Sequence, residues 1–288
     1  FGCGKRPTLV RRKGGRRVRT ETVVIRGAGD LATGIAHRLW RSGFRLLMLE
    51  IPQPTVIRRR VALAEAVYEG EITVEGMRGV KIENLTEAER AWDRGAVPIL
   101  IDPEARCLKQ LGPKVLVDAI MAKKNLGTRR DLAPVVIGVG PGFVAGLDVD
   151  AVVETQRGHH LGRVIYQGAA APNTGVPGQI LGYTEERVLR VPPEAAGRWE
   201  PRVEIGQQVS AGQIVAWVGA APVRSRIAGV VRGLLRPGLE VQPGQKVGDV
   251  DPRGRPEYCF SISDKARAVG GGVLEAICHL LWVSPPRK

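Results

Sequence analysis

Short apolar runs alternate with helical patterns through the first half of the chain. Five runs have the length and composition of buried strands: Thr22–Arg26, Arg45–Glu50, 97–102, 114–118 and 135–140. After the first run, Leu31, Ile35 and Leu39 follow helical spacing on one face. Asp30 is placed to cap this helix and Gly43 to end it. Buried strands that alternate with helices predict a parallel sheet, so we expect a Rossmann-like α/β domain.

An internal repeat occupies part of the second half. Three segments recur further along the chain at one fixed offset: Ala196-Gly197 as Ala228-Gly229, Val209 as Val241, and Gly212-Gln213 as Gly244-Gln245. Two such halves predict a lipoyl/biotinyl-like β-barrel. No lysine stands between Lys124 and Lys246, so this barrel lacks an acceptor for a carried cofactor, and binding or assembly is its expected role.

These patterns divide the chain into five parts. They are a basic arm at 1–20 that we expect to be disordered, a Rossmann-like nucleotide-binding domain at 21–150, a connecting region at 151–184, the barrel at 185–253 and a C-terminal segment with a helix at 254–288. In the last part, glycines at 270–272 precede an apolar stretch at 273–282. They allow either a phosphate contact at a helix start or a plain turn.

Charge and composition change this picture little. The formal net charge is +14, but eight basic residues and no acid lie between Lys5 and Arg19, which leaves about +6 elsewhere. That stretch has no aromatic residue to stack on bases, so we expect no nucleic-acid partner, although attraction to phosphates stays open.

No apolar run approaches the roughly 18 residues of a membrane span, and we expect a cytoplasmic protein. The cysteines form no C-x-x-C pair, and we expect no metal site.

Glycines and carboxylates stand where the expected strands end. In chain order these residues are Gly27, Glu50, Asp102, Asp118 and Gly140. Each residue type is common in turns, but ligands of open α/β sheets bind outside the carboxyl ends of the strands. The five together predict a ligand site at that edge.

The strongest local motif begins at Gly27. Gly27, Gly29 and Ala32 match G-x-G-x-x-[GA] between a strand and a helix, the pattern that brings a diphosphate to a helix start. Glu50 ends the next strand, at the spacing from Gly27 that suits a carboxylate bound to ribose hydroxyls. Asp30 would repel phosphates, which leaves helix capping or a non-standard ligand as its role. The motif predicts a dinucleotide-like ligand and leaves its identity open.

Two further features add candidates. Gly140 and Gly142 belong to a second glycine-rich loop after a strand, which allows either a phosphate or pterin contact or a tight turn. His159 and His160 form a polar cluster with Glu154 and Arg157, and either histidine is a candidate for acid–base catalysis.

Several segments resemble one known family. They include VVIRGAGDLATG at 23–34, VIGVGPGFVAGLDVD at 136–150, PNTGVPG at 172–178 and ISDKARAVGGG at 262–272. Their order resembles the YqeB-type accessory proteins of the selenium-dependent molybdenum hydroxylase system. The resemblance covers 21–277 and implies a maturation role, in which the molybdenum cofactor of the hydroxylase is inserted or modified. It implies no catalytic residue.

Three functions follow, in this order of preference. The first is an accessory protein that binds a dinucleotide-like ligand, molybdopterin dinucleotide or NAD, and has the hydroxylase apoprotein as its partner. The second is an NAD(P)-dependent oxidoreductase, and the third is a non-enzymatic assembly scaffold. Whether the chain is an enzyme and whether it forms a homo-oligomer stay open.

Overall fold

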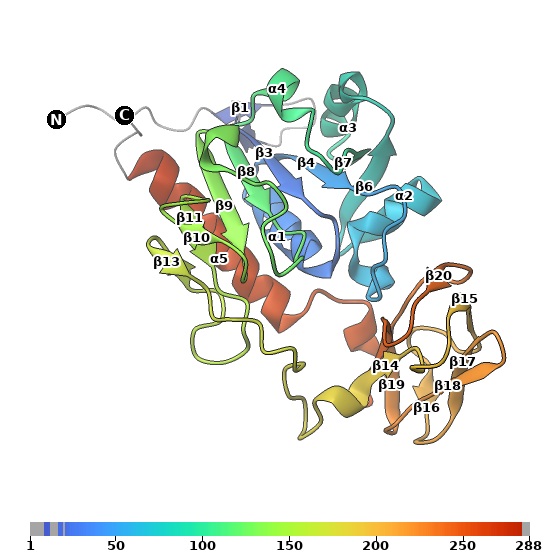
Figure 1. Ribbon diagram of the computed structural model, residues 1–288. Helices are drawn as coiled ribbons and strands as arrows, with labels where there is room; N and C mark the ends of the chain where they lie inside the picture. The colour runs from blue at the N-terminus through green and yellow to red at the C-terminus, as the bar shows by residue number, and fades with distance from the viewer. Residues whose placement is uncertain (1–8, 12–16, 20, 284–288) are drawn as a thin grey trace. The chain divides into compact units, whose positions relative to one another are not determined.

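The protein is described here from a computed structural model, which describes residues 9–11, 17–19 and 21–283 (Figure 1). The chain forms two compact units. Unit 1 comprises Phe1–Pro54, Leu63–Asn173 and Ile262–Lys288, and unit 2 comprises Thr55–Ala62 and Thr174–Ser261. Within the basic arm, β1 (Leu9–Arg11) and β2 (Arg17–Arg19) pair antiparallel. The rest of the arm, and the disorder expected of it, lies outside the described residues.

Unit 1 is built on a nine-stranded sheet. Its order is β12 (Val164–Ile165), β11 (Ala151–Val153), β9 (Val135–Val139), β8 (Val115–Asp118), β3 (Thr22–Arg26), β4 (Arg45–Glu50), β7 (Val97–Ile101), β6 (Met77–Ile82) and β5 (Glu71–Val74). The seven inner strands run parallel, while β12 and β5 pair antiparallel at the two edges. A two-stranded sheet pairs β10 (Val144–Ala145) with β13 (Gly168–Ala169).

Helices cover the sheet because its strands are apolar on both faces. The longer helices are α1 (Asp30–Arg41) and α5 (Asp264–Trp282), and the shorter ones are α2 (Ala66–Glu69), α3 (Ala88–Asp93) and α4 (Leu108–Leu111), with 3-10 turns η2 (Leu63–Glu65), η3 (Leu85–Glu87) and η4 (Arg130–Leu132). Val24, Leu47 and Leu116 join one buried cluster with Trp92 of α3 and Leu108 of α4. Helix α1 packs on β3 and β4, α5 packs on β9, β11 and β12, and the two helices lie side by side (Figure 1).

Small residues bring α5 close to its neighbours. A Cβ on Gly34 of α1 would lie 2.6 Å from Ala266 Cβ, and a Cβ on Gly272 would lie 2.2 Å from the Gly162 carbonyl oxygen. The three glycines at 270–272 therefore lie inside α5 and not before a helix start. The phosphate contact and the plain turn considered for them are both wrong, because packing outweighs their low helix propensity.

Unit 2 contains two antiparallel sheets of four strands each. One has the order β14 (Val188–Arg190), β21 (Lys246–Asp251), β19 (Gly229–Leu234) and β16 (Gln208–Val209), and the other β18 (Ala221–Arg224), β17 (Ile214–Val218), β15 (Gly197–Pro201) and β20 (Glu240–Val241). The 3-10 turns are η1 (Arg59–Val61), η5 (Glu185–Arg187) and η6 (Pro256–Cys259). The repeat relates β15 to β19, β16 to β20 and β17 to β21 at its single fixed offset. The core of the unit is apolar and includes Trp199, Val215 and Val247.

The predicted fold class is wrong in both of its parts. The large sheet is mixed, since the hairpin through Glu75 and Gly76, both at positive φ, adds β5 as an antiparallel edge. The strands of unit 2 form two separate four-stranded sheets, where the prediction was a lipoyl/biotinyl-like barrel. A repeat shows only that two halves fold alike, and it leaves open how their strands pair.

Candidate functional site

The carboxyl ends of the inner strands of unit 1 lie at one edge of the sheet. In the register of the sheet Arg26 is beside Leu49 of β4 and Asp118 of β8. The chain continues from β3 to β4 on one side, while β8 occupies the other side, so the strand order switches at β3. Such a switch point is where ligands of open α/β sheets bind.

The turn between β3 and α1 has the geometry of a phosphate-binding turn. Gly27 adopts φ +94°, and a Cβ there would lie 3.0 Å from the Ala119 carbonyl oxygen, so the position requires glycine. Gly29, and not Asp30 as predicted, is the N-cap residue of α1, and no side chain caps this helix. The first N–H groups of α1 and the positive end of its dipole are thus available to an anion.

Glu50 lies directly beside this turn. Its Oε2 accepts a hydrogen bond of 2.8 Å from Ala28 N, and its Oε1 accepts one of 2.8 Å from Ile51 N. Burial raises the pKa of the Glu50 carboxyl, and these two N–H groups oppose the shift. The structure therefore brings Glu50 together with Gly27 and Gly29, as the motif predicts.

Asp118 and Asp102 are held by their own surroundings. Asp118 is 2% exposed, and its Oδ2 accepts hydrogen bonds from Arg26 (3.2 Å) and Thr128 (2.6 Å). Asp102 accepts backbone hydrogen bonds of 3.0 Å from Arg106 N and 2.9 Å from Cys107 N. Burial and the Asp102 carboxylate raise the pKa of the Cys107 thiol to about 12. Both aspartates stabilise local structure at the edge where the sequence places ligand contacts.

The second glycine-rich loop is closely packed. Gly140 has φ +80°, and a Cβ there would lie 2.7 Å from Thr155 Oγ1. Gly142 has φ +110°, and a Cβ there would lie 2.8 Å from Lys124 N. These contacts favour the tight-turn interpretation of the loop.

Lys265 is a candidate that the sequence did not reveal. It lies in the first turn of α5, one residue before Ala266, which touches α1 at Gly34. Burial lowers the pKa of its ammonium group, and the nearby Arg157 lowers it further. The carboxylates of Asp30 and Glu154 act in the opposite direction. The side chain of Lys265 is half-buried.

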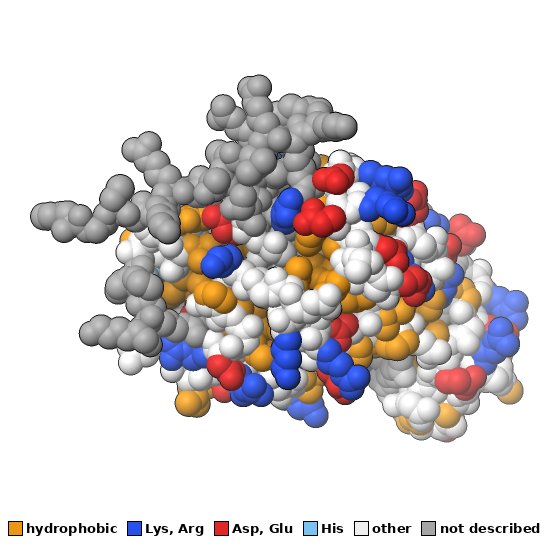
Figure 2. All heavy atoms as spheres, turned by 90° about the horizontal axis from the view of Figure 1, so that it is seen from above, with side chains coloured by type: hydrophobic (Ala, Val, Ile, Leu, Met, Phe, Trp, Pro, Cys, Tyr) orange, Lys and Arg blue, Asp and Glu red, His pale blue; other side chains and the backbone are white. Residues whose placement is uncertain are grey.

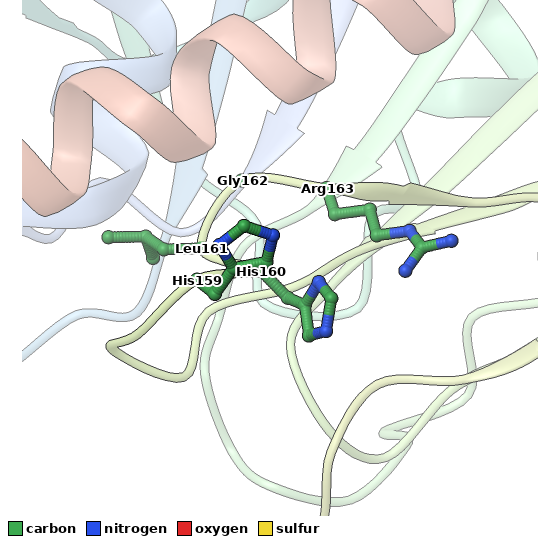
Figure 3. A pocket seen from close by; sticks show the side chains of 5 residues that line it. All are labelled: His159, His160, Leu161, Gly162 and Arg163. Atoms are coloured by element: carbon green, nitrogen blue, oxygen red, sulfur yellow. The ribbon is translucent and has the colours of Figure 1, made fainter.

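His159 and His160 lie in a loop after β11. Their ring centroids are 5.0 Å apart, and with Leu161, Gly162 and Arg163 they line an open pocket of about 470 Å³ (Figure 3). Both histidines are exposed. The neighbouring Glu154 is buried and accepts hydrogen bonds from the backbone N–H groups of Thr155 and Gln156. The buried carboxylate thus orders the start of the loop that carries the histidines.

Other kinds of site were sought in the part of the chain that the structure describes. Among those residues no group of three or more His, Cys, Asp or Glu is arranged to hold a metal ion. None of their helices combines the length and apolar character that crossing a membrane requires. On the face drawn in Figure 2, the coloured basic and acidic side chains are interspersed.

The fold and the site thus define the class of the protein. It is an α/β protein in which a helix without a side-chain cap starts at the strand switch point. The chain is 52% identical over 261 residues to the uncharacterized protein YqeB of Escherichia coli (strain K12), a match that covers 91% of this chain and 48% of that protein. It therefore spans about half the length of the curated relative it matches. This homologue confirms the YqeB part of the resemblance, and its name states no function. No protein-family profile matches the chain.

Solved structures give only weak similarities. The product-bound ectoine utilization protein EutE (DoeB) from Ruegeria pomeroyi is 11% identical, with 82% of this chain and 89% of that chain covered and a TM-score of 0.26. An aspartoacylase family protein from Mesorhizobium loti is also 11% identical, with coverages of 84% and 92% and a TM-score of 0.26. Scores of this size do not establish a shared architecture.

Proposed function

We propose that the protein is an accessory factor for the maturation of selenium-dependent molybdenum hydroxylases and binds a dinucleotide-like ligand at the turn between β3 and α1. One observation carries the proposal: an uncapped helix start follows a glycine at φ +94°, with a carboxylate 2.8 Å from the backbone N–H of Ala28. This arrangement suits a diphosphate followed by a sugar. The ligand is molybdopterin dinucleotide or NAD.

Each group at the turn would have a separate task. The N–H groups at the start of α1 would bind the diphosphate, and the half-buried ammonium of Lys265 would add a positive charge. Asp30 opposes an anion, and Lys265 lies near enough to influence it electrostatically and offset part of its charge. Glu50 would accept hydrogen bonds from ribose hydroxyls.

The maturation role and the hydroxylase apoprotein as partner rest on the resemblance of motifs such as GAGDLATG and ISDKARAVGGG. The homology to YqeB is consistent with them. A ligand with a diphosphate is what such a role requires, because the dinucleotide form of the molybdenum cofactor contains one.

Ligand binding can be tested directly. We expect native mass spectrometry of the purified protein to detect a retained dinucleotide, and calorimetry to detect binding of added NAD or of the released ligand. Gly29→Val should weaken that binding at least about tenfold, equivalent to ~1.4 kcal/mol. Its φ of −64° and ψ of −177° are open to any residue, so the variant should fold. The exposed Lys109→Val of α4 is the control; absence of any diphosphate ligand would refute the proposal.

A further inference from the structure

A second pocket of unit 1 lies between the edge hairpin β5–β6 and helix α3. It has a volume of about 260 Å³, and no residue of the turn between β3 and α1 lines it. Six charged side chains line it, of which four are basic and two acidic: Arg78, Lys81, Arg90, Arg94, Glu71 and Glu87. We call this site the basic pocket. Its basic side chains come from both walls, so the fold collects them from separate segments of the chain.

The spacing of these residues explains why they meet. Arg78, Val80 and Ile82 alternate along β6 and therefore share one face of the strand. Arg90 lies in α3 and Arg94 is its C-cap residue, four positions later. Residues at that spacing are neighbours on one side of a helix. The strand and the helix thus each turn basic side chains toward the same pocket.

Apolar side chains also line the basic pocket. Ile82, Ala91 and Ala96 belong to its lining, and each is 5% exposed or less. Val80 of the lining is half-buried. By contrast, Arg90 and Arg94 are exposed. The pocket therefore has an apolar floor and a basic rim.

Two of the four basic side chains have carboxylate partners. Arg78 donates two hydrogen bonds to Glu71 Oε2, from Nε at 3.1 Å and from Nη2 at 2.6 Å. Lys81 Nζ lies 2.9 Å from Glu83 Oε1. The charges of Arg78 and Lys81 are therefore compensated within the chain.

Arg90 and Arg94 are the two basic side chains that lack such a partner. In the part of the chain that the structure describes, neither guanidinium forms a hydrogen bond or an ion pair. Glu87, the other carboxylate of the lining, accepts a hydrogen bond of 3.0 Å from Asn84 Nδ2 instead. Like charges four residues apart also destabilise a helix slightly. A single exposed arginine is ordinary, but two adjacent guanidinium groups at the rim of one pocket suit a shared anion.

We propose that the basic pocket binds a small amphipathic anion, an organic molecule in which a phosphate or carboxylate group adjoins an apolar part. The oxyanion would accept hydrogen bonds from the planar guanidinium groups of Arg90 and Arg94, and its charge would relieve their repulsion. The apolar part would lie against Ile82 and Ala91. A volume of about 260 Å³ is slightly below the roughly 300–1,000 Å³ typical of drug-sized ligands, which limits the ligand to a small molecule.

Calorimetry of the full chain at low ionic strength tests the proposal. Phenyl phosphate or benzoate should bind with a Kd of about 1 mM or below, and the tighter of the two identifies phosphate or carboxylate as the preferred group. Inorganic phosphate should bind at least about threefold more weakly than phenyl phosphate, because it has no apolar part to bury. The double variant Arg90→Gln/Arg94→Gln should weaken binding at least about tenfold. Because both side chains are exposed, its Tm should stay close to that of the wild type.

Two further proteins make the result specific. Arg106→Gln/Arg129→Gln makes the same charge change in unit 1 at exposed ion pairs outside the pocket and should keep the full affinity. Gly29→Val should also keep it, and Arg90→Gln/Arg94→Gln should keep the affinity for NAD, so this proposal and the proposed function can fail separately.

Four results would overturn the proposal. They are that neither organic anion binds the wild type, that inorganic phosphate binds as tightly as phenyl phosphate, that Arg90→Gln/Arg94→Gln retains the binding, or that one of the two control proteins loses it as completely.

Discussion

The two units bury charged groups with different kinds of partner. At the strand edge of unit 1, Asp118 has Arg26 and Thr128 as partners, and the Glu50 carboxylate accepts two backbone N–H groups. In unit 2, the buried Asp251 carboxylate accepts three hydrogen bonds from Arg253, while the buried Arg232 lies 3.7 Å from the same carboxylate through its Nε. The strand-end residues of unit 1, which looked functional, are largely satisfied by the fold. The partners around a polar side chain are therefore a better guide to its role than its residue type.

The largest expected effect tests whether Asp118 is structural. Asp118→Ala leaves Arg26 buried without its carboxylate, and loss of one partner of a buried pair costs about 3–5 kcal/mol of unfolding free energy. Urea unfolding measures this change. Asp131→Ala removes an exposed partner of Arg129 and should leave the midpoint unchanged. Equal effects for the two variants would contradict a structural role for Asp118.

A smaller effect distinguishes packing from ligand binding in α5. Gly272→Ala places a Cβ 2.2 Å from a backbone oxygen and should destabilise the protein by about 1–3 kcal/mol. Gly271 has no atom within 4 Å of such a Cβ, so Gly271→Ala should stabilise the helix by about 0.5–1 kcal/mol. Chemical unfolding of both variants checks the pair. If Gly272→Ala were as stable as Gly271→Ala, the close approach to Gly162 would be wrong.

Proton uptake tests the role of Lys265 in the proposed diphosphate site. The pKa of Lys265 is lowered in the free protein, and a bound anion should raise it, so binding should take up protons at pH values between the two. Calorimetry in buffers of different ionisation enthalpy measures the uptake. It should increase from neutral toward alkaline pH and disappear in Lys265→Met. Unchanged uptake in that variant would exclude Lys265.

The smallest effect is expected at the two histidines. Because His159 and His160 are exposed, replacing both with alanine should change stability by no more than about 0.5 kcal/mol. Dinucleotide affinity should also stay the same, since neither side chain belongs to the turn between β3 and α1. A loss of nicotinamide turnover in the double variant would instead favour the oxidoreductase hypothesis.

The sequence predicts local elements better than their assembly. The first two apolar runs predict β3 and β4 with the bounds that the structure has. The G-x-G-x-x-A motif correctly predicts a glycine turn between β3 and α1. The two sheets of unit 2 depend on pairing between distant strands, such as β15 with β20, which periodicity does not encode. Helix α5 begins at Asp264, well before the expected 273, because its glycines pack against α1 and Gly162.

The missed site residues have the same cause. Lys265 and Gly27 lie near opposite ends of the chain, and Lys265 joins its surroundings only when α5 packs on α1. Arg232 stands in an ordinary apolar strand pattern, and its pairing with Asp251 appears only when β19 and β21 meet with a shift of register at this residue. The charges that surround a buried side chain are a property of its three-dimensional neighbours.

Helix α5 also has a consequence for how the protein is made. Unit 1 takes its last helix from Asp264–Trp282, after the whole of unit 2 has been synthesised. During synthesis, the larger segment of unit 2, Thr174–Ser261, therefore emerges from the ribosome before the helix that covers β9, β11 and β12. We therefore expect chains that end before Asp264 to expose the apolar face of these strands and to aggregate rather than to form a shorter folded protein.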